Sequence, residues 1–201
     1  NFILSREFNN VLHYHSYSNV LIHSWGDGTL PDEPDLTTFR EIGKEMTRYN
    51  GYLVGTGTET IGYGVNGDAV DWTYGTAGKI SYTPEVGSFS DNFWPSENRV
   101  IPICQDQVYS NSVFAMISGS DYIIYDKIIN NRYPAIDDTI SISLVVQNRG
   151  LTTSNGSVII DITPLNSLSY SNIDNIVIET LASRSTDTTE ILLSISSDIQ
   201  N

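Results

Sequence analysis

Apolar residues in the first part of the chain recur with helical spacing in two places. One amphipathic helix is predicted from the positions of Phe39, Ile42, Met46 and Tyr49. Asp35 is expected to cap its start and Gly51 to end it, since aspartate and glycine are typical of those two positions. A second helix is predicted over residues 105–117, with an apolar side formed by Tyr109, Val113, Met116 and Ile117.

Strand-forming residues are concentrated in four short segments of the same region. These segments are residues 10–16, 20–22, 52–55 and 79–85. Because helices and strands are interspersed, the sequence predicts an α/β architecture for this part of the chain.

The last third of the chain has a different pattern. Ile140, Ile142, Leu144 and Val146 alternate with mostly polar residues, which predicts a half-buried strand. Turn signals and short apolar runs follow, the runs lying at residues 158–162, 176–178 and 191–195. Of 21 aromatic residues, 18 lie up to and including Tyr122. We therefore expect two domains, residues 1–122 and a small β-sandwich over residues 123–201.

Composition excludes several classes of function. Lys and Arg total 10 against 24 Asp and Glu, a net charge of −14, so nucleic acid and anionic membranes are poor partners. The apolar runs are only a few residues long, whereas a membrane span needs about 20. Cys104 is the single cysteine, so neither an intrachain disulfide nor a cysteine-based zinc site can form, and we expect a small buried side chain there.

Two histidines are the first candidates for chemistry. His13 and His15 are two positions apart in a predicted strand, so both side chains would leave the same face. Such a pair can hold one metal ion, although histidines that only hydrogen-bond to their surroundings are more common.

A series of short motifs then changes the picture. The chain reads HSYSN at 15–19, has Trp25-Gly26 after an apolar run, and continues with Tyr63, DWTYG at 71–75, ISYTPE at 80–85 and FWPS at 93–96. In order and spacing, residues 8–119 resemble the catalytic C-terminal half of zinc carboxypeptidases of the funnelin type, the carboxypeptidase A/B/T family. The resemblance implies the C-terminal part of a mixed-sheet zinc-carboxypeptidase-like domain, followed here by an all-β sandwich that we expect to be immunoglobulin-like.

The resemblance also implies roles for individual residues. His15 matches the third zinc ligand and Glu85 the general base, which takes a proton from water and later gives it to the leaving amine. Tyr63 matches the tyrosine that closes over the substrate's C-terminal carboxylate. Ser16 and Tyr17 match positions that line the cleft, although plain strand packing explains them equally well.

The pocket for the substrate's C-terminal side chain is implied in the same way. Val65, Val70 and Thr83 match its lining and favour an apolar side chain. Asp68 lies in the same turn, where its carboxylate could pair with Lys or Arg and broaden the specificity. The alternative is an ordinary solvated aspartate in a turn.

One part of the family's pattern is missing. The first two zinc ligands belong to an upstream HxxE motif, but the residues three beyond His13, His15 and His23 are Ser16, Ser18 and Gly26. One ligand cannot hold catalytic zinc. We therefore expect a processed or truncated chain, for which three explanations are open. The N-terminal half of the enzyme could be a separate polypeptide, the chain could be an incomplete stretch of a longer sequence, or the chain could be a truncated relative without activity.

The leading hypothesis is a secreted, periplasmic or cell-surface bacterial metallocarboxypeptidase. It would use Zn2+ to release C-terminal residues from peptides or proteins. The main alternative is an inactive carboxypeptidase-like scaffold whose β-sandwich is adhesive or glycan-binding. A third option is an unrelated metallohydrolase that uses His13 and His15 as a ligand pair.

Overall fold

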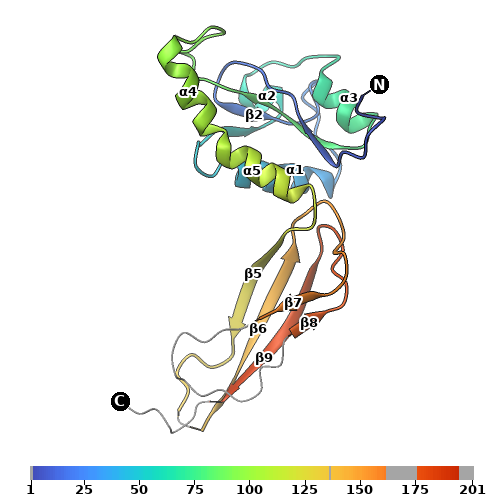
Figure 1. Cartoon of the computed structure of the whole chain (residues 1–201), viewed down its shortest axis with the longest axis vertical. Coiled ribbons are helices and arrows are strands. Elements are labelled where there is room, and N and C mark those ends of the chain that lie inside the picture. The colour runs from blue at the N-terminus through green and yellow to red at the C-terminus, as the bar shows by residue number, and fades with distance from the viewer. Residues whose placement is uncertain (1, 136, 162–175, 195–201) are drawn as a thin grey trace. The chain divides into compact units, whose positions relative to one another are not determined.

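The computed structural model describes residues 2–135, 137–161 and 176–194. The chain divides into two compact units, Asn1–Ser118 and Gly119–Asn201, which are described separately below (Figure 1). The sequence places the boundary after residue 122, which is the first residue of strand β5 (Tyr122–Ile129).

A mixed four-stranded sheet forms the centre of unit 1, in the order β1-β4-β2-β3. The pairs β1/β4 and β2/β3 are parallel, whereas β2 and β4 are antiparallel. This arrangement confirms the predicted mixed α/β architecture. The strands are β1 (Asn10–Leu12), β2 (Val20–Ile22), β3 (Leu53–Gly55) and β4 (Ile80–Glu85).

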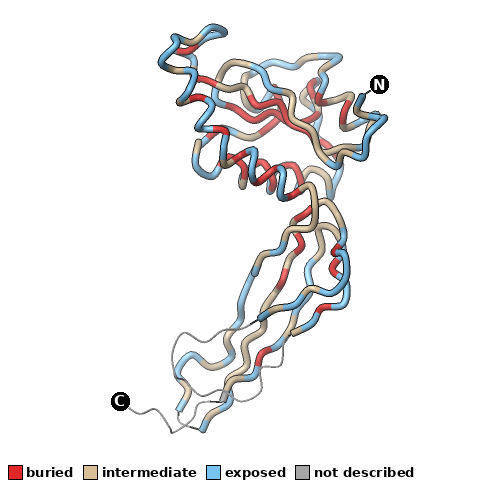
Figure 2. Tube along the Cα trace, in the orientation of Figure 1, coloured by how far each residue is buried: buried red, intermediate tan, exposed pale blue. Residues whose placement is uncertain are grey.

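One face of this sheet carries the apolar core of unit 1. Tyr82 of β4 is fully buried, and its hydroxyl donates to the backbone oxygen of Phe39 at 2.6 Å. Its ring meets Phe39 and Phe114 edge-on. Phe39 lies on α1 (Asp35–Met46) and Phe114 on α5 (Val108–Ile117), so these two helices cover this face. Buried residues accordingly concentrate in the strands and in these helices (Figure 2).

Helix α3 (Ala69–Gly75) covers part of the opposite face. Ser81 is buried there and donates its hydroxyl to the backbone oxygen of Val70, at 3.1 Å. Side chains alternate between the two faces of a strand. Thr83 and Glu85 of β4 therefore point to the α3 side of the sheet.

The helix predicted from residue 35 is confirmed, but its ends differ from the prediction. Pro34 occupies the N-cap position and Asp35 is the first helical residue, where it accepts a hydrogen bond from the Tyr74 hydroxyl at 2.7 Å. The helix ends at Met46, so Tyr49 follows it and is 72% exposed instead of lying on its apolar side. Gly51 has the positive φ of +69° that favours glycine.

The single helix predicted over residues 105–117 is two helices, α4 (Glu97–Asp106) and α5, separated by Gln107. Met116 was predicted on the apolar side but is 58% exposed, whereas Phe114 is buried. Cys104 is exposed, which contradicts its predicted burial. Within the described residues, no helix has the length and apolar composition that crossing a bilayer requires.

Two short helices of unit 1 were not predicted. Helix α2 (Gly57–Thr60) starts with a capping box, in which Thr56 and Glu59 each accept a hydrogen bond from the other's backbone N–H. Asp68 is the N-cap residue of α3, and its carboxylate accepts from the backbone N–H of Val70. Both helices are too short to show a clear apolar period.

The described residues of unit 2 form two antiparallel sheets. The first has the order β5-β6-β9, and the second pairs β7 with β8. Val146, Ile178 and Leu181 form a small buried cluster in this unit, with Val158 and Ile160 packed against it. Besides β5, the strands are β6 (Thr139–Asn148), β7 (Val158–Ile160), β8 (Ile176–Ile178) and β9 (Thr186–Ser194).

The strands predicted in this unit are present, and β5 is an additional one. Ile162 and Ile195, which end two of the predicted runs, lie outside the described residues. Asn148 is fully buried and hydrogen-bonded through both ends of its amide, to the backbone of Asp121, Gly150, Thr152 and Leu181. The immunoglobulin-like assignment stays a prediction.

Candidate functional site

The chain brings His15 and Glu85 together at the end of two strands. After β1 the backbone pairs with β4 again at an isolated bridge between these residues. The N–H of His15 donates to the Pro84 oxygen at 3.0 Å, and the N–H of Val86 donates to the His15 oxygen at 3.0 Å. The His15 Nδ1 and Glu85 Oε1 atoms are consequently 3.6 Å apart.

The two side chains differ in their exposure to solvent. The imidazole of His15 is 56% exposed, whereas the Glu85 carboxylate is 13% exposed. Burial raises the pKa of Glu85; the nearby imidazole of His15 lowers it and the carboxylate of Asp68 raises it. Glu85 thus holds a proton more readily than an exposed glutamate does, which suits a group that must accept a proton and release it again.

His13 lies on the same face but has a different environment. Its Nε2 is 2.9 Å from the Thr73 hydroxyl oxygen, and that hydroxyl donates to the Ala69 oxygen at 2.8 Å. Because the single hydroxyl proton is used there, Thr73 accepts from the Nε2–H of His13. Burial lowers the pKa of His13. An imidazole engaged with a helix in this way does not favour the ligand-pair hypothesis for His13 and His15.

A first cavity of about 330 Å³ opens beside His15 and Glu85. Of the predicted pocket residues, Val65, Asp68 and Thr83 line it, as does Tyr63, which is 60% exposed. Val70 is fully buried and is not among the lining residues. The remaining lining residues are Ile22, Gly26, Gly57, Ile61, Asn66, Gly67 and Ala69.

The polar groups that line this cavity differ in whether they have hydrogen-bond partners. Thr83 is only 2% exposed, and its hydroxyl has no hydrogen-bond partner among the described residues. Asp68 uses one carboxylate oxygen to cap α3. None of the described residues that line the cavity is a lysine or arginine. The cavity therefore offers the negative charge of Asp68 to a side chain that enters it, whereas the Thr83 hydroxyl oxygen is buried in its wall.

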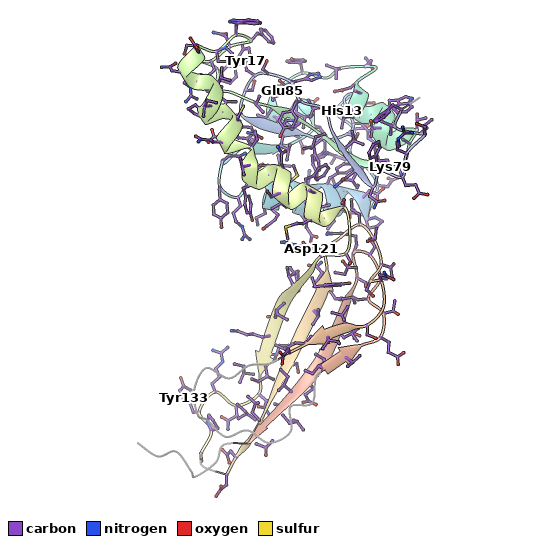
Figure 3. The ribbon with its side chains drawn as sticks, viewed as in Figure 1. His13, Tyr17, Lys79, Glu85, Asp121 and Tyr133 are labelled. Carbon is purple, nitrogen blue, oxygen red and sulfur yellow. The ribbon has the colours of Figure 1, made fainter. Side chains whose placement is uncertain are left out.

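A second cavity of about 330 Å³ adjoins the first. Ser16 and Tyr17 line it, together with Ser18, Phe89 and Phe93. Both cavities are lined by His15, Ile61, Tyr63 and Glu85, so they meet at the predicted catalytic groups. Figure 3 shows Tyr17, Glu85 and His13 in this part of unit 1.

Several lining residues were not predicted from the sequence. Ile22 belongs to an apolar strand that reads as ordinary core, and Ile61 follows a four-residue helix with no recognisable pattern. Phe89 and Phe93 lie in an irregular loop between β4 and α4. The FWPS string at residues 93–96 was the one available signal, and it indicated family resemblance only.

The described residues do not form a complete metal site. No three side chains of His, Cys, Asp or Glu in the described ranges are grouped so that they could hold an ion. The imidazole of His15 is exposed, which fits one ligand position. One imidazole alone does not hold catalytic zinc.

Comparison with known proteins identifies the family. No curated protein matches the chain. A solved structure of bovine thrombin-activatable fibrinolysis inhibitor, in complex with tick carboxypeptidase inhibitor, matches at 20% identity and a TM-score of 0.48, covering 55% of this chain and 39% of that one. The chain thus spans well under half the length of that protein. The family model for zinc carboxypeptidases matches residues 1–110, and the chain belongs to the zinc carboxypeptidase family.

Proposed function

We propose that this chain supplies one zinc ligand, His15, and the general base, Glu85, of a metallocarboxypeptidase that releases the C-terminal residue of a peptide or protein. The observation that carries the proposal is the 3.6 Å approach of His15 Nδ1 to Glu85 Oε1 where two open cavities meet. Bound zinc supplies a Lewis acid that activates water and polarises the scissile carbonyl.

Glu85 carries the proton transfers in this proposal. Its carboxylate takes a proton from the attacking water and delivers it to the amine that leaves. Burial and the neighbouring negative charge of Asp68 support the second step, because both raise the pKa of Glu85.

The first cavity receives the C-terminal residue of the substrate. The Tyr63 hydroxyl can donate to the substrate's terminal carboxylate, and Val65 provides apolar contact for its side chain. Thr83 adds to the wall of the pocket and Asp68 adds a charged group, which suits a positively charged side chain as well as an apolar one. Val70 would then act from beneath, by packing behind the pocket wall.

The remaining zinc ligands would come from polypeptide outside this sequence. Among the described strands, β1 pairs only with β4, so its other edge is open. An open edge is a template for a further strand. We infer that the missing N-terminal part of the catalytic domain pairs there, in the same polypeptide or a separate chain. We also propose an extracytoplasmic location, and an accessory role for unit 2 as an immunoglobulin-like sandwich.

Metal content and hydrolysis test the proposal in the protein together with its upstream part. We expect one equivalent of zinc, and loss of C-terminal residue release when a chelator removes it. Glu85→Gln should keep the zinc and lose hydrolysis, whereas His15→Ala should lose both. His13→Gln is the matched control and should bind zinc normally. A metal-free protein that hydrolyses no peptide would favour the inactive scaffold instead.

A further inference from the structure

Asparagine followed by glycine occurs three times in the chain, at residues 50–51, 66–67 and 155–156. The backbone nitrogen that follows an asparagine can attack the carbonyl carbon of the asparagine side-chain amide. Glycine favours this attack because it has no Cβ to hinder the approach. The reaction needs a free asparagine side chain and a free glycine N–H, and the three pairs differ in how these two groups are held.

Both groups are held in the pair Asn50-Gly51. The Asn50 Nδ2 donates to the backbone oxygen of Asp106 at 3.2 Å, and the Asn50 Oδ1 accepts from the backbone N–H of Tyr52 at 3.1 Å. The Gly51 N–H donates to the backbone oxygen of Thr47 at 2.9 Å. Attack would have to break these hydrogen bonds, so this pair is protected.

Both groups are free in the pair Asn66-Gly67. The two residues are exposed, and within the described ranges neither the Asn66 side chain nor the Gly67 N–H forms a hydrogen bond. Gly67 has φ +77°, and apart from its chain neighbours no atom lies within 4 Å of the place where a Cβ would stand. The turn is anchored on either side of the pair, because the Val65 N–H donates to the Gly26 oxygen at 2.7 Å and Asp68 caps α3. The pair itself is unhindered.

The third pair, Asn155-Gly156, shares these features but belongs to unit 2. Both residues are exposed, Gly156 has φ +93°, and neither group has a hydrogen bond within the described part of the chain. Neither residue lines one of the two cavities beside the predicted catalytic pair. Asn66 and Gly67, in contrast, both line the first cavity, where Asp68 already supplies a carboxylate.

We propose that Asn66 deamidates spontaneously and that the product adds a second carboxylate to the first cavity, beside Asp68. The Gly67 nitrogen bonds to the Asn66 Cγ and gives its proton to a base in solution, and the side-chain nitrogen takes up a proton and leaves as ammonia. The result is a five-membered cyclic imide. Water then adds to one of its two carbonyl carbons and breaks the bond from that carbon to the Gly67 nitrogen, which takes up a proton. Opening at Cγ gives aspartate, and opening at the backbone carbon gives isoaspartate.

Either product changes the charge of the first cavity. Each event replaces a neutral amide with a carboxylate and takes the net charge of the chain from −14 to −15. None of the described residues that line the cavity is a lysine or arginine that could balance the new charge. A cationic side chain that enters the cavity gains a second attractive group, so deamidation shifts the preference toward basic C-terminal residues. This shift rests on the proposed function, whereas the reaction at Asn66 does not.

Mass spectrometry of peptides from the ageing protein tests the reaction. The protein with its upstream part is kept folded in mildly alkaline buffer, and samples are digested at intervals. We expect conversion of Asn66 to be more than about tenfold faster than conversion of Asn50, because hydrogen bonds protect the Asn50-Gly51 pair. Asn66→Gln should abolish the conversion at residue 66 and leave that of Asn155 unchanged, because the longer side chain forms a cyclic imide far more slowly. Equal rates for Asn66 and Asn50 would overturn the inference, whether the upstream part covers the turn or the turn is too rigid to react.

Asn66→Asp gives the aspartate product at full occupancy and tests the effect on specificity. The substrates are N-acetyl-Ala-Ala-Arg and N-acetyl-Ala-Ala-Leu. We expect the ratio of kcat/KM for the arginine peptide to that for the leucine peptide to rise about two- to fivefold, the size expected of one exposed charge pair. Asn155→Asp is the matched control, since it makes the same change of charge in unit 2 and should leave this ratio unchanged.

The modification site and the peptidase proposal fail in different ways. If Asn66 converts but neither peptide is hydrolysed, the peptidase proposal is wrong and the modification site stands. If both peptides are hydrolysed but Asn66 stays unconverted, the modification site is wrong and the peptidase proposal stands. If Asn66 converts but Asn66→Asp leaves the arginine-to-leucine ratio unchanged, the effect on specificity is wrong.

Discussion

Asp68 combines a structural and an electrostatic role in one side chain. Its carboxylate caps α3 by accepting from the Val70 N–H at 3.2 Å, and its charge reaches Glu85, His13 and Asp71. Asparagine caps helices as well as aspartate does but carries no charge. Asp68→Asn therefore separates the two roles.

We predict that Asp68→Asn changes specificity and leaves folding intact. If the carboxylate recognises basic side chains, release of C-terminal arginine should fall about tenfold relative to leucine, the typical effect of losing one charge-assisted hydrogen bond. The measurement is kcat/KM for peptides ending in Arg, Leu and Glu. Asp106→Asn makes the same charge change at an exposed site away from the cavity and should have no effect. An unchanged arginine rate in Asp68→Asn would reject the basic pocket.

His23 is a buried residue that the proposed chemistry does not use. It is 0% exposed, stacks on Phe39 with a centroid distance of 5.1 Å, and places Nδ1 2.7 Å from the Ser24 oxygen. Burial lowers its pKa from the ordinary 6.5, against smaller opposing effects of the Ser24 oxygen and Glu59. The folded protein therefore keeps this imidazole neutral at a pH where the unfolded chain binds a proton.

This difference predicts that the protein becomes less stable as the pH decreases below about 6.5. His23 contributes its full stability above pH 6.5, and part of that contribution is lost as the pH falls from there toward the lower pKa of the folded state. Urea unfolding at about pH 7.5 and 5.5 measures the loss. His23→Phe keeps the stack on Phe39 but cannot titrate, so its stability should depend less on pH. Equal pH dependence in both proteins would show that His23 is not responsible.

At the scale of single elements, Phe114 gives α5 an aromatic contact with the sheet. Phe114 is 4% exposed and its ring meets Tyr82 edge-on at 5.6 Å, whereas Met116 on the same helix is 58% exposed. We predict that Phe114→Ala lowers the free energy of unfolding by about 3–5 kcal/mol, the usual cost of deleting a buried aromatic side chain. Met116→Ala should cost less than about 0.5 kcal/mol. Urea unfolding followed by tryptophan fluorescence measures the free energy of unfolding of both variants. Similar losses in the two variants would mean that Phe114 is not the residue that packs α5 against the sheet.

Local patterns predicted the elements that have a clear period. Helix α1 and strand β2 were found because their apolar residues face one core. Helices α2 and α3 were missed because they have four and seven residues, less than the length over which a period can be recognised. Strand β5 was missed because its residues are mostly exposed and do not alternate in polarity.

The candidate site shows the same limit for contacts between distant residues. Motif resemblance singled out His15 and Glu85, but their approach depends on parallel pairing of β1 with β4, which no local pattern reveals. The loop between β4 and α4 is a similar case. Phe89 and Phe93 of this loop contact the Tyr17 ring, and the ion pair between Asp91 and Arg99 joins the loop to α4, which no local pattern reveals.

Across the whole molecule, the acidic excess affects stability. With 24 acidic and 10 basic side chains, at least 14 carboxylates have no Lys or Arg partner of their own even if every basic residue forms one pair. Exposed ion pairs contribute little, commonly about 0–1 kcal/mol. Repulsion among the remaining carboxylates therefore opposes compaction at low ionic strength.

We predict that sodium chloride stabilises the protein. The screening length falls from about 10 Å at 0.1 M salt to about 3 Å at 1 M, so repulsion between surface carboxylates weakens while the buried core is unaffected. The urea midpoint should rise between about 0.02 and 1 M NaCl. Asp106→Lys changes the net charge from −14 to −12 at an exposed position. This variant should be more stable than the unchanged protein at low salt and gain less from added salt. Parallel salt dependences for the two proteins would mean that the gain comes from salt effects on apolar burial and not from screening of the acidic excess.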